Sequence, residues 1–272
     1  MTGQQEAPPL LSLVIPAYNE EENLRRGALH EAADYLAHQD YASELIVVDD
    51  GSDDATAALV TEAARRWPLV SLQATEHGGK ARAVTAGVLA AQGQYVIFTD
   101  MDQSTPVHFV EDALRELQGG SDGVIASRNI KGTTRRDGPL LRRLLGRGFA
   151  LLVRTLLLPD IRDSQCGFKG FRQEVAQELF GAMKVFGAGA QAPKGPMVTA
   201  FDVELLVLAK KRGYGIKEIP IAWTHVSTTR VNPLKDSYRM LNQVLRVWLN
   251  DRRGRYDVSP SEPSEGGGQK FP

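Results

Sequence analysis

The first half of the chain alternates short apolar runs with longer segments of helical periodicity. Short runs rich in apolar and β-branched residues predict strands at residues 11–15, 44–48, 70–73, 95–99 and 123–126. The segments between them predict helices at residues 20–39, 55–66, 81–91 and 107–118. Strands that alternate with helices are typical of a parallel sheet covered on both faces. Ligands of such sheets bind at the carboxyl ends of the strands, here residues 16–20, 49–52 and 100–103.

The second half of the chain has a less regular pattern. Helices are predicted over residues 140–158, 201–211 and 233–250, and a strand over residues 167–172. Residues 187–196 are rich in Gly, Ala and Pro, which predicts a loop. From Asp257 onward, Ser, Pro, Glu and Gly dominate. We therefore expect one domain over residues 11–256, with disordered segments at residues 1–10 and 257–272.

Composition and charge narrow the class of protein. Of the 272 residues, 42% are hydrophobic and 24% are charged, which are ordinary values for a soluble globular protein. The net charge of −1 offers no global attraction for nucleic acid. The single cysteine, Cys166, excludes an internal disulfide and suits a reducing cytoplasm. No apolar stretch approaches the ~20 residues of a membrane-spanning helix, and residues 1–9 lack the pattern of a signal peptide.

Two acidic residues directly follow the fourth predicted strand. Asp100 and Asp102 are separated by one residue, and an extended Asp-x-Asp turn aims both carboxylates into the same crevice. Hard oxygen ligands of this kind suit Mg²⁺ or Mn²⁺, and Gln103 adds a neutral oxygen. The structural alternative is helix capping, because Ser104 or Thr105 before a proline starts the next helix well. Capping needs no pair of acids, so we favour the metal site.

Acidic residues also end the second predicted strand. Asp49 and Asp50 precede a glycine and a serine that permit a tight turn, and a carboxylate here can accept hydrogen bonds from a nucleotide base or ribose. The structural alternative is capping of the helix that begins near residue 55. The segment 16–20 has the same two interpretations, since Asn19 can cap a helix and Tyr18 can lie against a base.

A glycine pair before Lys80 invites comparison with phosphate-binding loops. A Walker A loop would need glycine at position 74 and a hydroxyl residue after the lysine, but Ala74 and Ala81 stand there. No Gly-x-Gly-x-x-Gly turn follows the first strand, which excludes a dinucleotide-binding turn as well. Lys80 remains a candidate for neutralising a diphosphate at the start of its helix.

Positive charge gathers in the second half of the chain. On a helix, Arg143, Arg147 and Arg154 fall within roughly 40° of one another, in a segment otherwise rich in Leu and Phe. A second basic cluster, at residues 252, 253 and 255, follows the last predicted helix. One interpretation is a solvated basic face. The other is a peripheral protein that binds an anionic membrane surface and presents arginines to an acceptor phosphate.

Three of these stretches together resemble the signatures of family 2 glycosyltransferases: VIPAYNE at residues 14–20, IVVDDGS at residues 46–52 and TDMD at residues 99–102. Further along, SR at 127–128, DSQCGFK at 163–169 and AFDVELL at 200–206 resemble the dolichyl-phosphate β-glucosyltransferase branch. The likeness implies the GT-A fold, an α/β arrangement with a mostly parallel sheet flanked by helices. In that fold the first half binds the nucleotide and the second half serves the acceptor.

The resemblance also implies roles for single residues. It assigns donor binding to Pro16, Ala17, Tyr18, Glu20, Asp49, Asp100, Met101, Asp102, Arg128 and Arg230. Asp100 and Asp102 would hold Mg²⁺ or Mn²⁺ on the donor diphosphate, with Gln103 as a third ligand. Arg128 would approach the phosphates during the reaction. Asp202 stands where other members place a catalytic base, and its alternative role is to cap the helix that runs through residue 208.

The implied activity is that of an inverting, metal-dependent glycosyltransferase. It would move a hexose from a nucleotide-diphosphate sugar, UDP-glucose or GDP-mannose, to a polyprenyl phosphate. Residues 103–105 lean toward the mannosyl enzymes, whereas Thr224 stands where those enzymes carry arginine, so both donors stay open. We expect a cytoplasmic protein, peripheral on the cytoplasmic face of the membrane.

Three alternatives to this activity remain. The first is the same donor chemistry with a soluble acceptor, such as a glycan or a small hydroxy acid. The second is a sugar nucleotidyltransferase, which would show a Gly-rich basic loop after the first strand. The third is a non-catalytic module that binds sugar nucleotides, which would not need both acids of the Asp-x-Asp pair.

Overall fold

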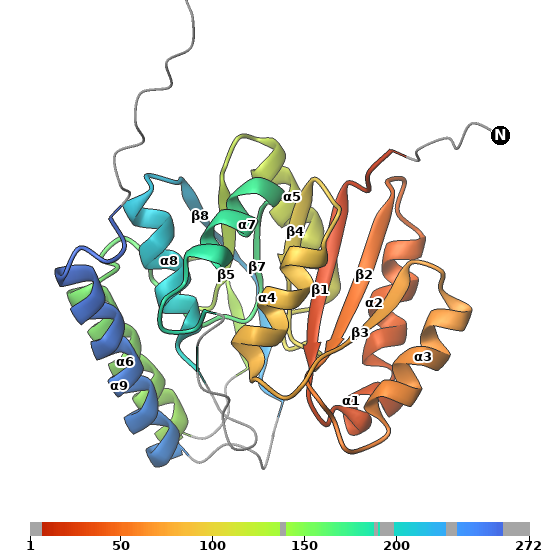
Figure 1. The fold of residues 1–272 in the computed structure, drawn as a ribbon, viewed down its shortest axis with the longest axis horizontal. Helices are drawn as coiled ribbons and strands as arrows, with labels where there is room; N and C mark the ends of the chain where they lie inside the picture. The colour runs from red at the N-terminus through yellow and green to blue at the C-terminus, as the bar shows by residue number, and fades with distance from the viewer. Residues whose placement is uncertain (1–6, 137–139, 188–189, 191–198, 227–232, 258–272) are drawn as a thin grey trace, which may run out of the picture.

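The computed structural model describes residues 7–136, 140–187, 190, 199–226 and 233–257. Within these ranges, a seven-stranded sheet has the strand order β3-β2-β1-β4-β7-β5-β8 (Figure 1). Its strands are β1 (Leu11–Ala17), β2 (Ser43–Asp49), β3 (Val70–Ala74), β4 (Tyr95–Phe98), β5 (Gly123–Ser127), β7 (Lys169–Arg172) and β8 (Ile216–Pro220). A parallel pair, β6 (Thr134–Arg136) and β9 (Ala222–Thr224), forms a second small sheet.

Helices cover both faces of the large sheet, as its apolar pattern predicted. One face packs against α4 (Lys80–Ala90), α7 (Gln173–Ala182) and α8 (Phe201–Lys211). The other face packs against α2 (Ala28–Ala37), α3 (Thr56–Arg66) and α5 (Val110–Gln118), which follows the short helix η1 (Val107–Phe109). Successive residues of β1 take opposite sides, because side chains alternate along a strand: Val14 joins the first core and Leu13 the second.

The sequence predicted one helix over residues 20–39, and this was wrong. The structure has α1 (Glu21–Arg25) and then α2, with Gly27 between them at a φ of 91°. Only glycine adopts this backbone conformation without strain, so the chain turns there although the apolar pattern continues.

The sheet is not parallel throughout. β7 pairs antiparallel with both β4 and β5, and the other pairs in the sheet are parallel. The sequence predicted a strand in this region but not its direction or its insertion between two parallel strands. It also gave no prediction for α7, β6, β8 or β9. β8 has two adjacent charged residues, Lys217 and Glu218, and lies at the edge of the sheet, so its sequence lacks the alternation that predicts a strand.

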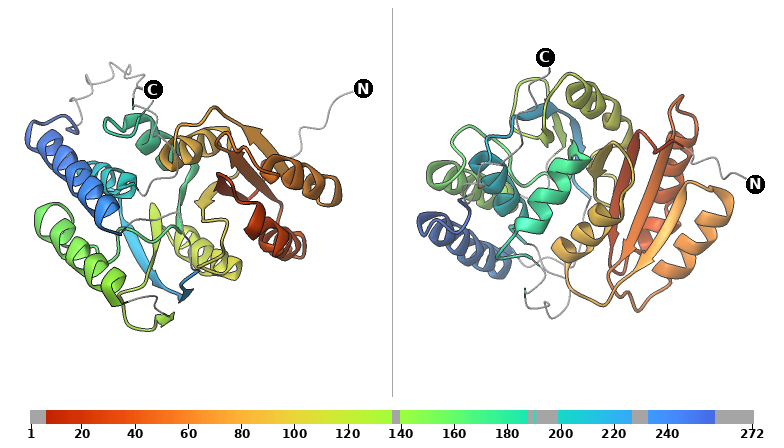
Figure 2. Two further views of the ribbon diagram at one scale, coloured as in Figure 1. Left: turned by 90° about the horizontal axis from the view of Figure 1, so that it is seen from below. Right: turned by 45° about the horizontal axis from the view of Figure 1, so that its top comes forward.

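Two long helices lie beyond the end of the sheet that is opposite β3. α6 (Leu140–Leu156) and α9 (Pro233–Arg252) pack against each other on the side of the molecule away from β3 (Figures 1 and 2). Among the described residues, no helix combines the length and the apolar composition that crossing a bilayer requires. The disorder predicted for both chain ends falls largely outside the described residues, as does most of the loop predicted at residues 187–196.

Candidate active site

The segments that follow β1, β2 and β4 lie side by side at one edge of the sheet. The register pairs Ala17 with Asp49 and Val14 with Phe98 in neighbouring parallel strands. Pro16 and Ala17 therefore belong to the last part of β1, and Asp49 ends β2. The sequence predicted this convergence from the strand pattern alone.

Asn19 joins the first two of these segments. Its side-chain Oδ1 accepts a hydrogen bond from the backbone N–H of Asp53 (3.0 Å), and its own N–H donates to the hydroxyl of Ser52 (2.9 Å). The N-cap position of α1 is Glu20, and it makes no side-chain capping bond. The capping role considered for Asn19 is therefore wrong, and the residue instead holds two strand ends together, with a φ of 54°.

The ring of Tyr18 stacks on the ring of His77, with centroids 4.3 Å apart. Asp50 positions that histidine. The Asp50 carboxylate is buried, with the residue 2% exposed, and it accepts hydrogen bonds from the N–H groups of Gly78 (2.7 Å) and Gly79 (2.8 Å). Nδ1 of His77 lies 2.9 Å from Oδ2 of Asp50. Asp50 thus shapes the turn before α4. Sequence analysis did not identify His77, whose stacking on Tyr18 depends on a contact across the fold.

Asp49 lies beside this aromatic pair at the end of β2. It is 5% exposed, and its Oδ1 accepts hydrogen bonds from the N–H and the hydroxyl of Ser52. The next helix, α3, has Ala55 at its N-cap and no side-chain capping bond, so Asp49 does not cap it. The carboxylate therefore orders the turn that borders the rings of Tyr18 and His77.

The Asp-x-Asp pair follows β4 as predicted. Asp100 forms an ion pair with Lys80, whose side chain comes from the first turn of α4. Their side chains keep 38% and 33% of their surface exposed, so a ligand in the crevice can reach both. Met101, between the two acids, is 2% exposed and packs in the core beneath them.

The two carboxylates have opposite electrostatic environments. Burial acts to raise the pKa of Asp100, but the Lys80 ammonium beside it holds that pKa below its usual value. Burial and then the negative charge of Asp100 raise the pKa of Asp102. The pKa of Lys80 is raised because Asp100, Asp202 and Asp102 together outweigh its burial. Three acids thus act on the ammonium of Lys80, and Lys169 and Arg128 add positive charge near Asp100.

The residues present fit a divalent cation. Gln103 has a φ of 50°, and its side-chain Oε1 is buried without a hydrogen-bond partner among the described residues. Such an orphaned oxygen beside two carboxylates is a suitable third ligand for Mg²⁺ or Mn²⁺. The described residues contain no cluster of three or more His, Cys, Asp or Glu that could hold a metal. The cation would therefore share its coordination with a bound diphosphate, as Mg²⁺ sites often do.

Asp202 lies in the first turn of α8 and pairs with a lysine that sequence analysis missed. Lys169 is 0% exposed, and its Nζ lies 2.5 Å from Oδ1 of Asp202 and also donates to the carbonyl of Cys166. The N-cap of α8 is Ala200 and makes no side-chain capping bond. The alternative role of Asp202 as a helix cap is therefore wrong, and the residue balances a buried ammonium.

Arg128 is held at the site by Asp163. Its Nε and Nη2 donate to the two carboxylate oxygens of Asp163 at 2.7 and 2.8 Å. Burial acts to raise the pKa of Asp163, and the guanidinium of Arg128 holds that pKa below its usual value. The charge of Arg128 also lowers the pKa of Asp100, which places the two residues in one electrostatic environment. Arg230 lies outside the described residues.

Gly167 leaves space for the carboxylate of Asp100, a role that the sequence pattern did not reveal. A Cβ atom at Gly167 would lie 2.0 Å from Oδ2 of Asp100 and 2.7 Å from its Cγ. The Gly-Phe-Lys stretch therefore contributes twice to the crevice. Gly167 leaves space for one carboxylate, and Lys169 pairs with another.

We predict that Gly167→Ala displaces Asp100 and weakens UDP binding in the presence of Mn²⁺ by about tenfold or more, which corresponds to ~1.4 kcal/mol. The control is Gly181→Ala on α7, because a Cβ atom there meets nothing within 4 Å. Calorimetric titration with UDP and Mn²⁺ measures both variants. Wild-type affinity in a folded Gly167→Ala protein would contradict this account of the crevice.

Comparison with known proteins identifies the family. The model of the family described as Glycosyl transferase family 2 matches residues 12–180. Dolichyl-phosphate β-glucosyltransferase of Dictyostelium discoideum is 31% identical over 251 residues, which cover 87% of this chain and 73% of the relative. The Drosophila melanogaster protein of the same name is 30% identical over 277 residues, which cover 96% of this chain and 81% of the relative.

Solved structures share the fold at lower identity. Glucosyl-3-phosphoglycerate synthase from Mycobacterium tuberculosis, in complex with Mn²⁺, UDP and glucosyl-3-phosphoglycerate, has a TM-score of 0.61 and 20% identity, covering 93% of this chain and 82% of that one. A mannosyltransferase from Pyrobaculum calidifontis, in complex with GDP-Man and Mn²⁺, has a TM-score of 0.57 and 20% identity, covering 91% and 67%. The fold, the family match and the dolichyl-phosphate glucosyltransferase relatives agree: the chain belongs to glycosyltransferase family 2 and is a hexosyltransferase with the GT-A fold that its motifs predicted.

Proposed function

We propose that this hexosyltransferase uses a divalent cation to transfer glucose from UDP-glucose to a polyprenyl phosphate, with inversion at the anomeric carbon. The names of the relatives from Dictyostelium discoideum and Drosophila melanogaster support the sugar and the class of acceptor. The neighbour with bound UDP and Mn²⁺ supports the nucleotide and the metal. In the reaction, an acceptor phosphate oxygen forms a bond to the anomeric carbon. The bond from that carbon to the diphosphate breaks, and UDP leaves with the electron pair.

The donor would lie along the ends of β1, β2 and β4. The Tyr18–His77 pair offers an aromatic surface for the base, and Asp49 offers a carboxylate beside it. When bound by Asp100, Asp102 and the Gln103 oxygen, the cation would supply positive charge to the diphosphate. Lys80 lies in the same crevice, and moving its ammonium from Asp100 to the leaving diphosphate would stabilise the charge that develops there.

The buried Lys169–Asp202 ion pair is the observation that favours a phosphate acceptor. A hydroxyl acceptor needs a base to take its proton, and Asp202 was the residue expected to do so. One oxygen of Asp202 already pairs with an ammonium that has no access to solvent. A phosphate monoester is largely ionised at pH 7 and attacks without a base. Asp202 would then position charge in the crevice rather than remove a proton.

A transfer assay tests this proposal. The donors are UDP-glucose and GDP-mannose, and the acceptors are a polyprenyl phosphate in detergent and phosphoglyceric acid, the soluble ligand of one structural neighbour. We expect glucose transfer from UDP-glucose to the lipid phosphate, loss of transfer with EDTA, and recovery with Mn²⁺ or Mg²⁺. Efficient transfer to the soluble hydroxy acid, with none to the lipid phosphate, would favour the soluble-acceptor alternative instead.

A lipid acceptor requires contact with a membrane, and α6 has a suitable outer surface. Leu144 and Leu151 are 55% and 61% exposed, and Arg147 and Arg154 are exposed between and beyond them. Their spacing of three and four residues places these four side chains on one helical stripe. Arg143 is half-buried and has an interaction partner, so the stripe excludes it. Exposed leucines that alternate with arginines suit an anionic bilayer surface.

We predict that the double variant Arg147→Glu/Arg154→Glu loses binding to anionic vesicles. Each cation near such a surface is worth about 1 kcal/mol, and the wild-type interaction should weaken with salt. Vesicle co-sedimentation measures the effect, and Arg65→Glu, an exposed arginine on α3, is the control. The assignment of the outer surface of α6 as a membrane-binding surface would be wrong if the wild type did not bind anionic vesicles, or if the double variant bound them equally well.

A further inference from the structure

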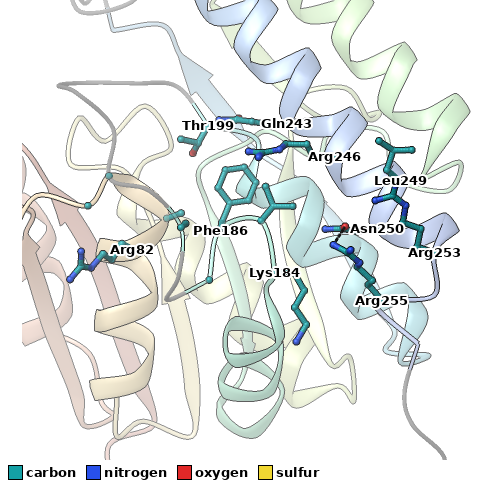
Figure 3. A pocket seen from close by; sticks show the side chains of 16 residues that line it. Arg82, Lys184, Phe186, Thr199, Gln243, Arg246, Leu249, Asn250, Arg253 and Arg255 are labelled. Carbon is teal, nitrogen blue, oxygen red and sulfur yellow. Dashed lines mark hydrogen bonds between the residues drawn. The ribbon is translucent and has the colours of Figure 1, made fainter.

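A cavity of about 780 Å³ lies between α4, the segment after α7, and α9 (Figure 3). Gly78, Gly79 and Arg82 line it on the α4 side, and Arg246 and Leu249 of α9 line it on the opposite side. Its volume is within the range of ~300–1,000 Å³ that is typical of small-molecule sites. It is distinct from the donor crevice, because neither Asp100 nor Asp102 lines it.

Positively charged side chains line the cavity from both sides. Five cationic side chains line it: Arg82, Lys184, Arg246, Arg253 and Arg255. Figure 3 shows Arg82 on one side and the three arginines on and after α9 on the other. Among the described residues, no Asp or Glu lines the cavity and none of the five side chains forms an ion pair. Concentrated positive charge attracts an anionic ligand.

Buried hydrogen bonds fix the walls of this cavity. Glu204 is 0% exposed and accepts hydrogen bonds from the backbone N–H groups of residues 184, 185 and 186. The hydroxyl of Tyr256 also donates to Glu204, at 2.7 Å, which ties the chain after α9 to α8. Gln243 of α9 accepts from the N–H of Ala200 at 2.9 Å. The segments that carry the cations are therefore held before any ligand binds.

Part of the lining is apolar. Val185 and Phe186 line the cavity from the segment after α7, and Leu249, which is 40% exposed, lines it from α9. A small inorganic anion would leave this surface in contact with water. A phosphate whose substituent is apolar would cover it while pairing with the arginines.

Two segments that line the cavity lead directly into the elements that carry Lys80 and Asp202. Gly79 lines it, and the next residue along the chain is Lys80, the partner of Asp100. Thr199 also lines it, three residues before Asp202. A ligand in the cavity therefore lies next to the elements that carry both charged pairs of the crevice.

We propose that this cavity binds the acceptor as a phosphate monoester with an apolar chain: the cations hold the phosphate, and Val185, Phe186 and Leu249 hold the first apolar units. The inference rests on the proposed function for the identity of the acceptor. The assignment of the cavity as a binding site rests on its cationic lining, its volume and its position between α4 and α9. The basic cluster at residues 252–255 then serves the cavity through Arg253 and Arg255, whereas Arg252 lies over the ring of Trp248.

Direct binding without donor tests the cavity independently of catalysis. The probes are farnesyl phosphate, farnesol and glycerol phosphate, titrated against the wild type, Arg246→Ala, Arg246→Lys and Arg246→Ala/Arg253→Ala. Removing one charged contact should weaken farnesyl phosphate binding about tenfold, and removing two should weaken it further. Arg246→Lys should retain most of the affinity, and Arg65→Ala on α3 should match the wild type. UDP affinity should be unchanged in all variants.

The outcomes separate the site from the activity. Wild-type binding of farnesyl phosphate that weakens with salt and falls in the arginine variants supports the cavity, even if no sugar is transferred and the proposed function fails. Equal binding by the double variant and the wild type overturns the proposal. Equal affinity for glycerol phosphate and farnesyl phosphate overturns the role of the apolar wall and indicates a soluble phosphate ester as the ligand.

Discussion

The central constraint on this protein is the concentration of acidic side chains at one crevice, where Asp100 and Asp102 follow β4 and Asp202 lies in the first turn of α8. Asp100, Asp102 and Asp202 all act on the ammonium of Lys80, and the same crevice includes the buried pair of Lys169 with Asp202. Such a cluster is unfavourable without counter-charges, because burial and mutual repulsion both oppose ionisation of the acids. The two lysines and the Arg128–Asp163 pair offset part of that cost. A divalent cation and an anionic donor would complete the balance.

The surrounding structure holds these charges in place by steric and hydrogen-bonding constraints. Gly167 leaves space for Asp100, and Asp50 shapes the turn that leads into Lys80 through the N–H groups of Gly78 and Gly79. Glu204 has the corresponding role at the cavity between α4 and α9, where its carboxylate accepts hydrogen bonds from three backbone N–H groups and the Tyr256 hydroxyl. Burial raises the pKa of Tyr256, and the charge of Glu204 beside it raises it further. The crevice at Asp100 and the cavity between α4 and α9 are thus supported by different buried carboxylates, those of Asp50 and Glu204.

The positions of the strand ends could be predicted from the sequence, because the local pattern of apolar and polar residues determines where a strand ends. Apolar runs followed by Asp49 or Asp100 predicted both the sheet and the edge where ligands bind, and GT-A motifs narrowed the fold. Contacts between distant segments were not predictable in this way. The stacking of His77 on Tyr18, the pairing of Lys169 with Asp202 and the antiparallel insertion of β7 all join segments far apart in the sequence. The break at Gly27 was missed because helical periodicity continues across it.

Coupling between nucleotide and metal is the most direct test of the crevice. In the proposed site, Asp100, Asp102 and the orphaned oxygen of Gln103 would supply only part of a coordination shell. The cation and the diphosphate should then each complete the binding site of the other. Titration of UDP with and without Mn²⁺ measures this coupling. We expect Mn²⁺ to tighten UDP binding about tenfold or more in the wild type and to have no such effect in Asp102→Ala. Equal UDP affinity with and without Mn²⁺ in the wild type would contradict this expectation.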